Sequence, residues 1–208
     1  MVAIIDYDMG NVGSIKNMIK KIGGKSIITN DKSIITDASA IILPGVGSFD
    51  TGVRNLQKYN LFELLQELVL EKQVPILGIC LGMQLLGNSS EEGVEKGLSF
   101  IDADGIKFLD NPKLKIPHMG WNFVNKKKSS ILFEDFIDIP RFYFVHSYYM
   151  RCNNSLDVLA TTQYGIDFHS AFEKQNIYGV QFHPEKSHRF GTILLQGFLN
   201  KTNNVKLA

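Results

Sequence analysis

Hydrophobic residues in the first ninety positions occur in short continuous runs, and longer segments of mixed polarity separate them. The runs predict buried strands at residues 2–7, 25–29, 40–47 and 74–79. The intervening segments have helical periodicity at about residues 11–22, 52–72 and 81–86. Asn11 can cap the first helix, Gly23 and Gly24 end it, and the second helix is interrupted near Asn60. Continuous apolar strands with helices between them are typical of a parallel sheet that is covered on both faces.

The pattern changes from about Gly97 onward, where strand-like runs become shorter and more closely spaced. These runs lie at residues 105–109, 121–125, 141–150, 157–163, 168–174 and 176–183. Turn-forming residues separate them, which predicts antiparallel hairpins, and a last helix is expected over residues 188–199. The fold class we predict is therefore α/β: an open, mostly parallel, doubly wound sheet flanked by helices, with antiparallel extensions. One domain over residues 1–208 is the simplest organisation.

Composition and charge restrict the possible functions. The chain has 208 residues, 44% of them hydrophobic, and a formal net charge of +1 from 22 basic and 21 acidic residues. This balance disfavours a nucleic-acid-binding protein, which would have a basic face. The first residues lack a basic segment of the kind that begins a signal peptide, and no apolar run approaches the ~20 residues that span a bilayer. Two cysteines without a disulfide framework favour a reducing compartment, so we expect a cytoplasmic protein with no membrane partner.

Cys80 occupies an unusual place, because it lies where the fourth predicted strand meets the next helix. The stretch Gly78-Ile79-Cys80-Leu81-Gly82 has the form of a nucleophile elbow with cysteine in place of serine. Glycines on both sides would remove side chains that clash in such a tight turn. The N–H groups at the start of the helix would stabilise a thiolate. A free cysteine is commonly just a small buried hydrophobe, and the elbow alone does not decide between these interpretations.

A cysteine nucleophile needs a base, and His183 is the best candidate among the five histidines. His183 ends an apolar strand, and Pro184 stops the strand there. Glu185 lies two residues further on, so in extended backbone both side chains project to one side. Glu185 could then hold the imidazole in the useful tautomer, although a surface turn would have the same sequence. No histidine spacing in the chain suggests a metal site.

The third candidate element is the loop Pro44-Gly45-Val46-Gly47, which follows the third predicted strand. It therefore lies at the same carboxyl edge of the sheet as Cys80. Glycines in this loop leave backbone N–H groups free to approach a reacting oxygen. It is not a dinucleotide-binding fingerprint, because Asp50 occupies the position of the third glycine. An ordinary strand–helix turn is the alternative.

Taken together, these motifs resemble those of the class I (triad) glutamine amidotransferases. PGVG (44–47), GICLGMQ (78–84) and HPE (183–185) occur in the order and spacing of that family. IIDYDMGNVGS (4–14), KIPHMGWN (115–122), YFVHSYY (143–149) and QFHPEKS (181–187) resemble more narrowly the glutaminase subunits of imidazole glycerol phosphate synthase, which act in histidine biosynthesis. The resemblance extends over essentially the whole chain, and any one of these motifs alone is much less specific.

The resemblance implies hydrolysis of glutamine to glutamate and ammonia without a cofactor. In such a reaction Cys80 attacks the amide, His183 carries the proton from the thiol to the departing ammonia, and Glu185 orients His183. The oxyanion hole is formed by the Leu81 N–H and an N–H within Gly45-Val46-Gly47. The residues that correspond to substrate-binding positions are Gly82, Gln84, Glu92, Ser147 and Tyr148.

The resemblance also implies a partner, the cyclase subunit of imidazole glycerol phosphate synthase, with which the chain forms a heterodimer. The positions that correspond to the interface are Asn11, Trp121, Asn122 and Lys186. Departures from the family pattern occur at Asp8, at His169 and in residues 97–108. A physical argument supports a partner as well: no part of the chain remains for an ammonia-accepting active site, and ammonia released into neutral water is protonated.

Three other functions remain open from the sequence. A paralogous glutaminase could supply ammonia to a sugar amidotransferase of surface-polysaccharide biosynthesis, since the triad and much of the interface would be the same. A non-catalytic regulatory subunit is disfavoured by the intact set of Cys80, His183 and Glu185. A cysteine peptidase on a related fold is disfavoured by Gln84 and by the segment at 117–122.

Overall fold

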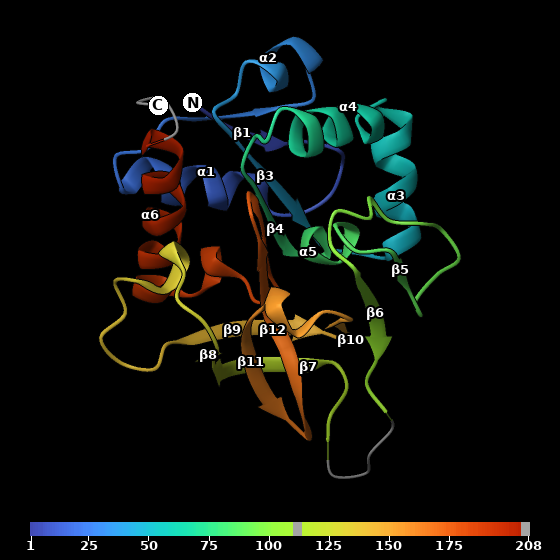
Figure 1. Cartoon of the computed structure of the whole chain (residues 1–208), viewed down its shortest axis with the longest axis vertical. Helices are drawn as coiled ribbons and strands as arrows, with labels where there is room; N and C mark the ends of the chain where they lie inside the picture. Colours follow the sequence, from blue (N-terminus) through green and yellow to red (C-terminus); the bar gives the residue numbers. More distant parts are fainter. Residues whose placement is uncertain (110–113, 205–208) are drawn as a thin grey trace.

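The computed structural model describes residues 1–109 and 114–204, and this part of the chain contains a central mixed sheet between two groups of helices (Figure 1). Its strands are β1 (Val2–Ile5), β2 (Ser26–Thr29), β3 (Ala40–Gly45), β4 (Ile76–Cys80), β5 (Ser89–Ser90), β6 (Ala103–Lys107), β7 (His118–Phe123), β8 (Asn125–Lys126), β9 (Arg141–His146), β10 (Tyr148–Cys152), β11 (Val158–Tyr164), β12 (Ile166–Lys174) and β13 (Ile177–Val180). Its helices are α1 (Val12–Lys21), α2 (Lys32–Thr36), α3 (Phe49–Lys58), α4 (Phe62–Gln66), α5 (Leu81–Leu85) and α6 (His188–Asn204). Short helical segments are η1 (Glu67–Glu71), η2 (Ile131–Phe133), η3 (Ser155–Asp157) and η4 (Pro184–Lys186).

Parallel strands form one half of the main sheet, in the order β2-β1-β3-β4-β13. Their side chains alternate between two hydrophobic clusters. In β1, Ala3 and Ile5 pack into the cluster that includes α2, α3 and α4, whereas Val2 and Ile4 pack into the cluster that includes α1 and α6. Because both faces are buried, these strands have the continuous apolar sequences from which they were predicted.

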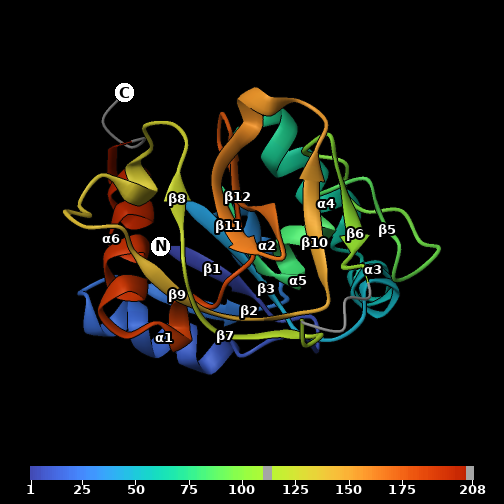
Figure 2. The same ribbon diagram turned by 90° about the horizontal axis from the view of Figure 1, so that it is seen from below.

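The second half of the chain is mainly antiparallel, as predicted. It extends the sheet in the order β13-β12-β10-β6-β5, and β11 pairs with β12 and β8. β7 and β9 form a separate antiparallel pair, in which His118 lies opposite His146 and Trp121 lies opposite Tyr143. In Figure 2 this pair lies along the same side of the molecule as α1 and α6.

Most of the predicted helices are confirmed, with differences in their bounds. Asn11 caps α1, since its Oδ1 accepts a hydrogen bond from the Ser14 N–H at 3.3 Å. The helix predicted over 52–72 begins earlier, at Phe49, and is divided at Asn60, which has a positive φ of 53°. Helix α2 was not predicted. Its N-cap is Asp31, whose carboxylate accepts a hydrogen bond from the Ser33 N–H at 2.8 Å.

Strand register brings the candidate residues to one edge of the sheet. Gly45 at the end of β3 lies opposite Cys80 at the end of β4, and Val180 at the end of β13 pairs with Ile79. The segment that leads to His183 therefore leaves the sheet at the carboxyl edge where the loop at 45–47 and the Cys80 turn also lie. No helix within residues 1–109 and 114–204 has the length and hydrophobicity that a membrane span requires.

Candidate active site

Cys80 has a strained backbone conformation at the junction of β4 and α5. Its φ of 54° and ψ of −110° are uncommon for a residue with a side chain. The turn is crowded: a Cβ on Gly82 would overlap the Leu43 carbonyl, and one on Gly78 would lie 2.7 Å from the Gly82 carbonyl oxygen. The glycines on both sides of Cys80 are therefore required by close backbone approach, as predicted for a nucleophile elbow.

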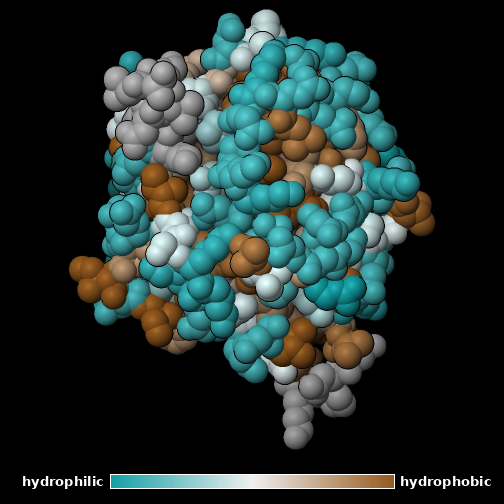
Figure 3. All heavy atoms as spheres, in the orientation of Figure 1, coloured by the Kyte–Doolittle hydropathy of each residue, from teal (hydrophilic) through white to brown (hydrophobic). Residues whose placement is uncertain are grey.

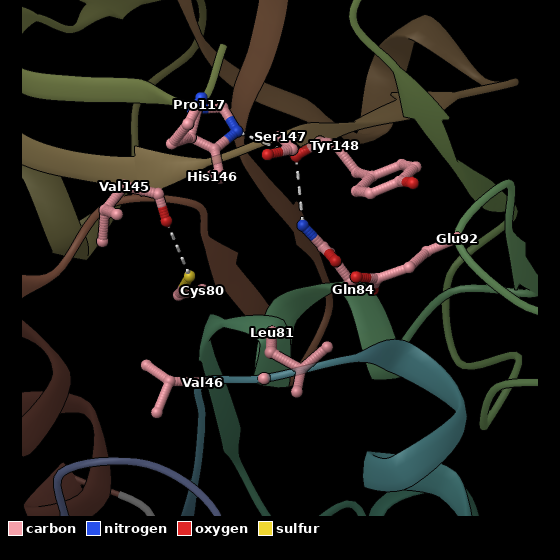
Figure 4. A pocket seen from close by; sticks show the side chains of 11 residues that line it. Val46, Cys80, Leu81, Gln84, Glu92, Pro117, Val145, His146, Ser147 and Tyr148 are labelled. Atoms are coloured by element: carbon pink, nitrogen blue, oxygen red, sulfur yellow. Dashed lines mark hydrogen bonds between the residues drawn. The ribbon is translucent and has the colours of Figure 1, made fainter.

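The Cys80 side chain lines a cavity of about 330 Å³, a size suited to a small molecule. Figure 4 shows this cavity, which is lined by Val46, Gly47, Cys80, Leu81, Gln84, Glu92, Pro117, Val145, His146, Ser147 and Tyr148. Cys80 is only 6% exposed. Two groups contact its Sγ at hydrogen-bonding distance for sulfur: the Val145 carbonyl oxygen at 3.9 Å and the Gln181 Nε2 at 3.7 Å.

His183 and Glu185 form a buried pair in the segment that follows β13. The His183 Nδ1 and the Glu185 Oε1 are 2.8 Å apart, and the two side chains are 2% and 3% exposed. Ser187 fixes the turn between them, because its Oγ donates to the His183 carbonyl at 2.6 Å and accepts from the Tyr143 N–H at 3.0 Å. The backbone N–H of His183 in turn donates to the Tyr143 carbonyl at 2.9 Å.

The surroundings of His183 favour its protonated form. Burial of the imidazole alone would lower its pKa, but Cys80 and Glu185 together raise the pKa to about 10. His183 Nε2 is buried and has no hydrogen-bond partner among the described residues. With Nδ1 occupied by Glu185, Nε2 is the atom that remains for exchanging a proton with Cys80.

The loop after β3 contributes part of the cavity wall. Val46 and Gly47 line the cavity, and Gly47 has a positive φ of 120°. Gly45 does not line it; its backbone nitrogen instead lies close to Gly10. The strand end is held from behind by Tyr7, whose hydroxyl donates to the Pro44 carbonyl at 2.5 Å. Burial, and then the proximity of Cys80, raises the pKa of Tyr7, so this hydroxyl keeps its proton and remains a donor.

Four of the five predicted substrate-binding residues line the cavity. Gln84 and Glu92 lie on one side, Ser147 and Tyr148 lie on another, and Gly82 lies behind the surface in the crowded turn. Gln84 uses both Nε2 hydrogens on protein partners, the Tyr148 carbonyl at 3.1 Å and the Gln181 Oε1 at 3.1 Å. One Glu92 oxygen, Oε2, accepts the N–H of Phe49 at 2.8 Å.

The four residues that the sequence assigned to a partner interface lie in different environments. Trp121 is 43% exposed and its ring stacks on His188, with centroids 5.7 Å apart and planes at 6°. The Lys186 ammonium lies 5.7 Å from the centre of the Tyr143 ring. Asn11 is used as the cap of α1. The fourth residue, Asn122, donates to the Gln163 carbonyl at 2.9 Å and is thus engaged within the chain.

Pro117 and Val145 line the cavity without having been predicted from the sequence, and the same is true of three more residues of the site. Gln181 contacts the thiol, Tyr7 supports the loop, and His146 lines the cavity. The position of Gln181, two residues before His183 on the same strand end, is a signal that could have identified it. Two of the departures from the family pattern make defined contacts: Asp8 binds Lys58 at 3.2 Å, and His169 Nδ1 accepts the N–H of Cys152 at 3.0 Å.

Within the described residues, no group of histidine, cysteine and carboxylate side chains is arranged to hold a metal ion.

The family model and the related sequences that match this chain point to the same protein family. A family model described as glutamine amidotransferase class-I matches residues 3–201. The chain is 56% identical over 201 residues to imidazole glycerol phosphate synthase subunit HisH 2 of Methanococcus maripaludis, covering 97% of this chain and 100% of that protein. It is 44% identical to the protein of the same name from Pseudomonas aeruginosa, covering 96% and 98% of the two chains.

Solved structures share the fold at much lower sequence identity. A glutamine amidotransferase structure superposes with a TM-score of 0.77 at 18% identity, covering 98% of this chain and 100% of that one. A chain of the PurLQS structure from Thermotoga maritima gives a TM-score of 0.72 at 19% identity, covering 96% and 97%. These matches confirm the predicted fold class, an open and mostly parallel sheet flanked by helices.

Proposed function

The chain belongs to the class I glutamine amidotransferases, as a HisH-type glutaminase subunit of imidazole glycerol phosphate synthase, and on that premise we propose that Cys80, His183 and Glu185 form its catalytic triad. The observation that carries this proposal is the meeting, at one sheet edge, of a strained cysteine with a buried histidine–carboxylate pair. Cys80 lines the cavity and interacts electrostatically with His183, while Glu185 occupies the other imidazole nitrogen.

In the proposed reaction, His183 takes the Cys80 proton at Nε2 and the thiolate attacks the side-chain amide carbon of glutamine. The C–N bond then breaks, the proton of His183 passes to the leaving nitrogen, and ammonia departs from a thioester on Cys80. Water attacks the thioester, with His183 again as the base, and releases glutamate and the free thiol. The Glu185 carboxylate stabilises the imidazolium that forms in each half of the cycle.

The oxyanion of the tetrahedral intermediates requires hydrogen-bond donors beside Cys80. The Leu81 N–H at the start of α5 is one candidate, and a peptide N–H of the loop at 45–47 is the other. Val46 and Gly47 line the same cavity as the thiol, and Gly45 pairs with Cys80 in the sheet, which supports the second assignment. Because glycine backbone adopts many conformations, a peptide of this loop can present its N–H or turn it away. Loss of one such donor costs on the order of 10²- to 10³-fold in turnover.

Substrate glutamine would place its α-amino acid end between Gln84, Glu92 and the Ser147–Tyr148 segment. Gln84 Nε2 is fully used by protein acceptors, so its Oε1 is the atom available to the substrate. The Gln84 oxygen and the Glu92 carboxylate face the same part of the cavity (Figure 4), where they would attract an α-ammonium group.

We further propose that the cyclase subunit of imidazole glycerol phosphate synthase docks on the outer face of the β7–β9 pair. Met119, Trp121 and Phe123 alternate along β7 and are all exposed on that face. An aromatic residue held in place by its neighbours is a typical interface hot spot. By contrast, the face seen in Figure 3 is mostly hydrophilic, with hydrophobic residues in small separate patches.

A basic cleft beside Trp121 adds a charge preference to this surface. The cleft has a volume of about 660 Å³ and is lined by Ser14, Asn17, Met18, Lys21, Glu185, Lys186, His188, Arg189, Thr192 and Ile193. Three basic side chains, of Lys21, Lys186 and Arg189, therefore surround an opening that reaches Glu185. The partner surface would be acidic at this point and apolar opposite Trp121.

Glutamate and ammonia release, measured with and without the ligand-bound cyclase, tests this function. We expect low activity in the isolated chain, an increase of about two orders of magnitude in the complex, and loss of turnover in Cys80→Ser. Formation of imidazole glycerol phosphate from glutamine in the complex supports the assigned acceptor. Full activity in Cys80→Ser contradicts the triad. A chain that does not bind the cyclase and delivers ammonia only to a sugar-modifying enzyme contradicts the assigned partner.

A further inference from the structure

A continuous series of hydrogen bonds runs from the β7–β9 pair toward the thiol of Cys80. It begins at Asn122, whose Nδ2 lies 3.3 Å from the His118 Nε2. The His118 Nδ1 is 2.9 Å from the His146 Nε2. The His146 Nδ1 is in turn 2.8 Å from the carbonyl oxygen of Tyr148, a residue that lines the cavity.

The same carbonyl oxygen continues the series toward the nucleophile. It accepts a hydrogen bond from the Gln84 Nε2 at 3.1 Å, and the other Nε2 hydrogen of Gln84 goes to the Gln181 Oε1 at 3.1 Å. Gln181 Nε2 then donates to the Cys80 Sγ at 3.7 Å. Each amide in this half has one orientation, because Tyr148 offers only an acceptor and the Gln181 oxygen must face Gln84.

The hydrogen-bond partners at the two ends of the histidine pair determine which nitrogen of each imidazole carries the proton. A carbonyl only accepts, so His146 must carry its proton on Nδ1 and accept at Nε2 from His118 Nδ1–H. His118 Nε2 is then an acceptor, which requires an N–H from Asn122. The Asn122 amide meets this requirement independently, since its Nδ2 donates to the Gln163 carbonyl and its Oδ1 accepts the Phe123 N–H at 2.8 Å. Both ends therefore give the same pair of tautomers.

Burial keeps both histidines of this series neutral. His118 is 3% exposed and His146 is 6% exposed, and burial lowers the pKa of His118 to about 4 and that of His146 to about 3. Neither imidazole carries a charge near neutral pH, so neither has a second proton that would reverse the direction of the hydrogen bonds. Fully satisfied buried networks of this kind hold their members in one arrangement.

We propose that Gln181 is a catalytic residue that stabilises the Cys80 thiolate through an N–H···S hydrogen bond, and that His118 and His146 are positioning residues that fix the direction of this donor through Tyr148 and Gln84. The proposal rests on the nucleophilic role proposed above for Cys80. A hydrogen bond to a charged acceptor is roughly twice as strong as one between neutral groups, so the contact favours the thiolate over the thiol. The Val145 carbonyl, 3.9 Å from the sulfur, can accept a hydrogen bond only from the protonated thiol.

The first test measures alkylation of Cys80 by iodoacetamide as a function of pH in the variant Gln181→Met. Methionine has a similar length but no N–H, so the pH profile of Cys80 alkylation should move to higher pH. On its acidic limb the rate should fall about tenfold. Gln196→Met is the matched control, because the Gln196 amide contacts Asn200 on α6 and its loss should leave the profile unchanged. A wild-type profile in folded Gln181→Met overturns the proposal.

The second test separates positioning from a purely structural role and still applies if Gln181→Met does not fold. In His146→Phe the donor to the Tyr148 carbonyl is lost, and in His146→Asn the side-chain Nδ2 replaces Nδ1 as that donor. We expect His146→Phe to slow alkylation and to raise the KM for glutamine of the complex about fivefold, and His146→Asn to restore most of both. Equal behaviour of the two variants, at whatever thermal stability, overturns the positioning role.

The catalytic role proposed for Cys80 can fail or hold independently of the role proposed for Gln181. If complete alkylation of Cys80 leaves glutamine hydrolysis unchanged, the proposed function of this cysteine fails. The alkylation profile of Gln181→Met would still report whether Gln181 donates to the sulfur.

Discussion

Replacing Glu185 with glutamine tests the role of the buried carboxylate most specifically. The substitution keeps the size of the side chain and an oxygen that can accept from His183 Nδ1, but it removes the negative charge. The two partners are 2.8 Å apart and almost completely buried, so little solvent screens them. A hydrogen bond to a charged group contributes about 1.5–3 kcal/mol. Because each 1.36 kcal/mol changes a rate about tenfold, kcat of Glu185→Gln should fall about 10- to 150-fold.

The assay is glutamate release at saturating glutamine in the complex with the cyclase and its ligand. Glu173→Gln is the matched control, because Glu173 also has a carboxylate oxygen that is buried without a hydrogen-bond partner among the described residues. It lies on β12 opposite Tyr178, toward the start of β4 and away from Cys80, and its loss should leave kcat unchanged. A kcat within twofold of the wild type in Glu185→Gln would refute the reasoning. So would a loss in folded protein as complete as that of Cys80→Ala.

Three further predictions concern packing, pH and the partner surface. Gly82→Ala should lower the free energy of unfolding by about 3 kcal/mol in denaturant titrations, since its Cβ would overlap the Leu43 carbonyl; Gly13→Ala, with nothing within 4 Å of its Cβ, should not destabilise the protein. The pKa of His146 is lowered from 6.5 to about 3, so its contribution to stability is complete above pH 6.5 and is lost as the pH falls; denaturation from about pH 7 to about pH 5.5 should show a loss of about 1 kcal/mol that His146→Asn lacks. Trp121→Ala should weaken cyclase binding in calorimetry without changing Cys80 alkylation, and unchanged affinity would contradict the assigned surface.

The sequence predicts the half of the fold in which each strand is buried on both faces. Hydrophobic runs identify β1, β3 and β4 because helices cover both sides of them. The local hydrophobic pattern does not predict secondary structure where neighbouring residues and strand pairing determine it. The pentapeptide KSIIT occurs twice, at 25–29 and at 32–36, and it forms β2 in the first copy and α2 in the second. The difference arises outside the pentapeptide: Asp31 caps the second copy, whereas the first copy pairs with β1.

In the candidate site, too, some residues can be predicted from the sequence and others cannot. Cys80 and the His183–Glu185 pair can be predicted because each motif has a local physical reason, a tight turn for one and a strand-ending proline for the other. The series through His118, His146 and Gln181 could not be predicted, because its members come from three strands, β7, β9 and β10, from helix α5 and from the segment that follows β13. Their contacts depend on the register of β7 against β9 and on how that pair lies against the main sheet, which no local pattern encodes.

The measurement that tests the catalytic role of Cys80 most directly is covalent trapping by a diazo-ketone analogue of glutamine, followed by mass spectrometry of the labelled chain. We predict one adduct, on Cys80, that forms in proportion to the loss of glutaminase activity. Cys152 is the internal control, since burial raises its pKa to about 12 and it lies outside the cavity. Labelling of Cys152 with Cys80 unmodified, or full glutaminase activity in a chain with Cys80 completely labelled, would contradict this role.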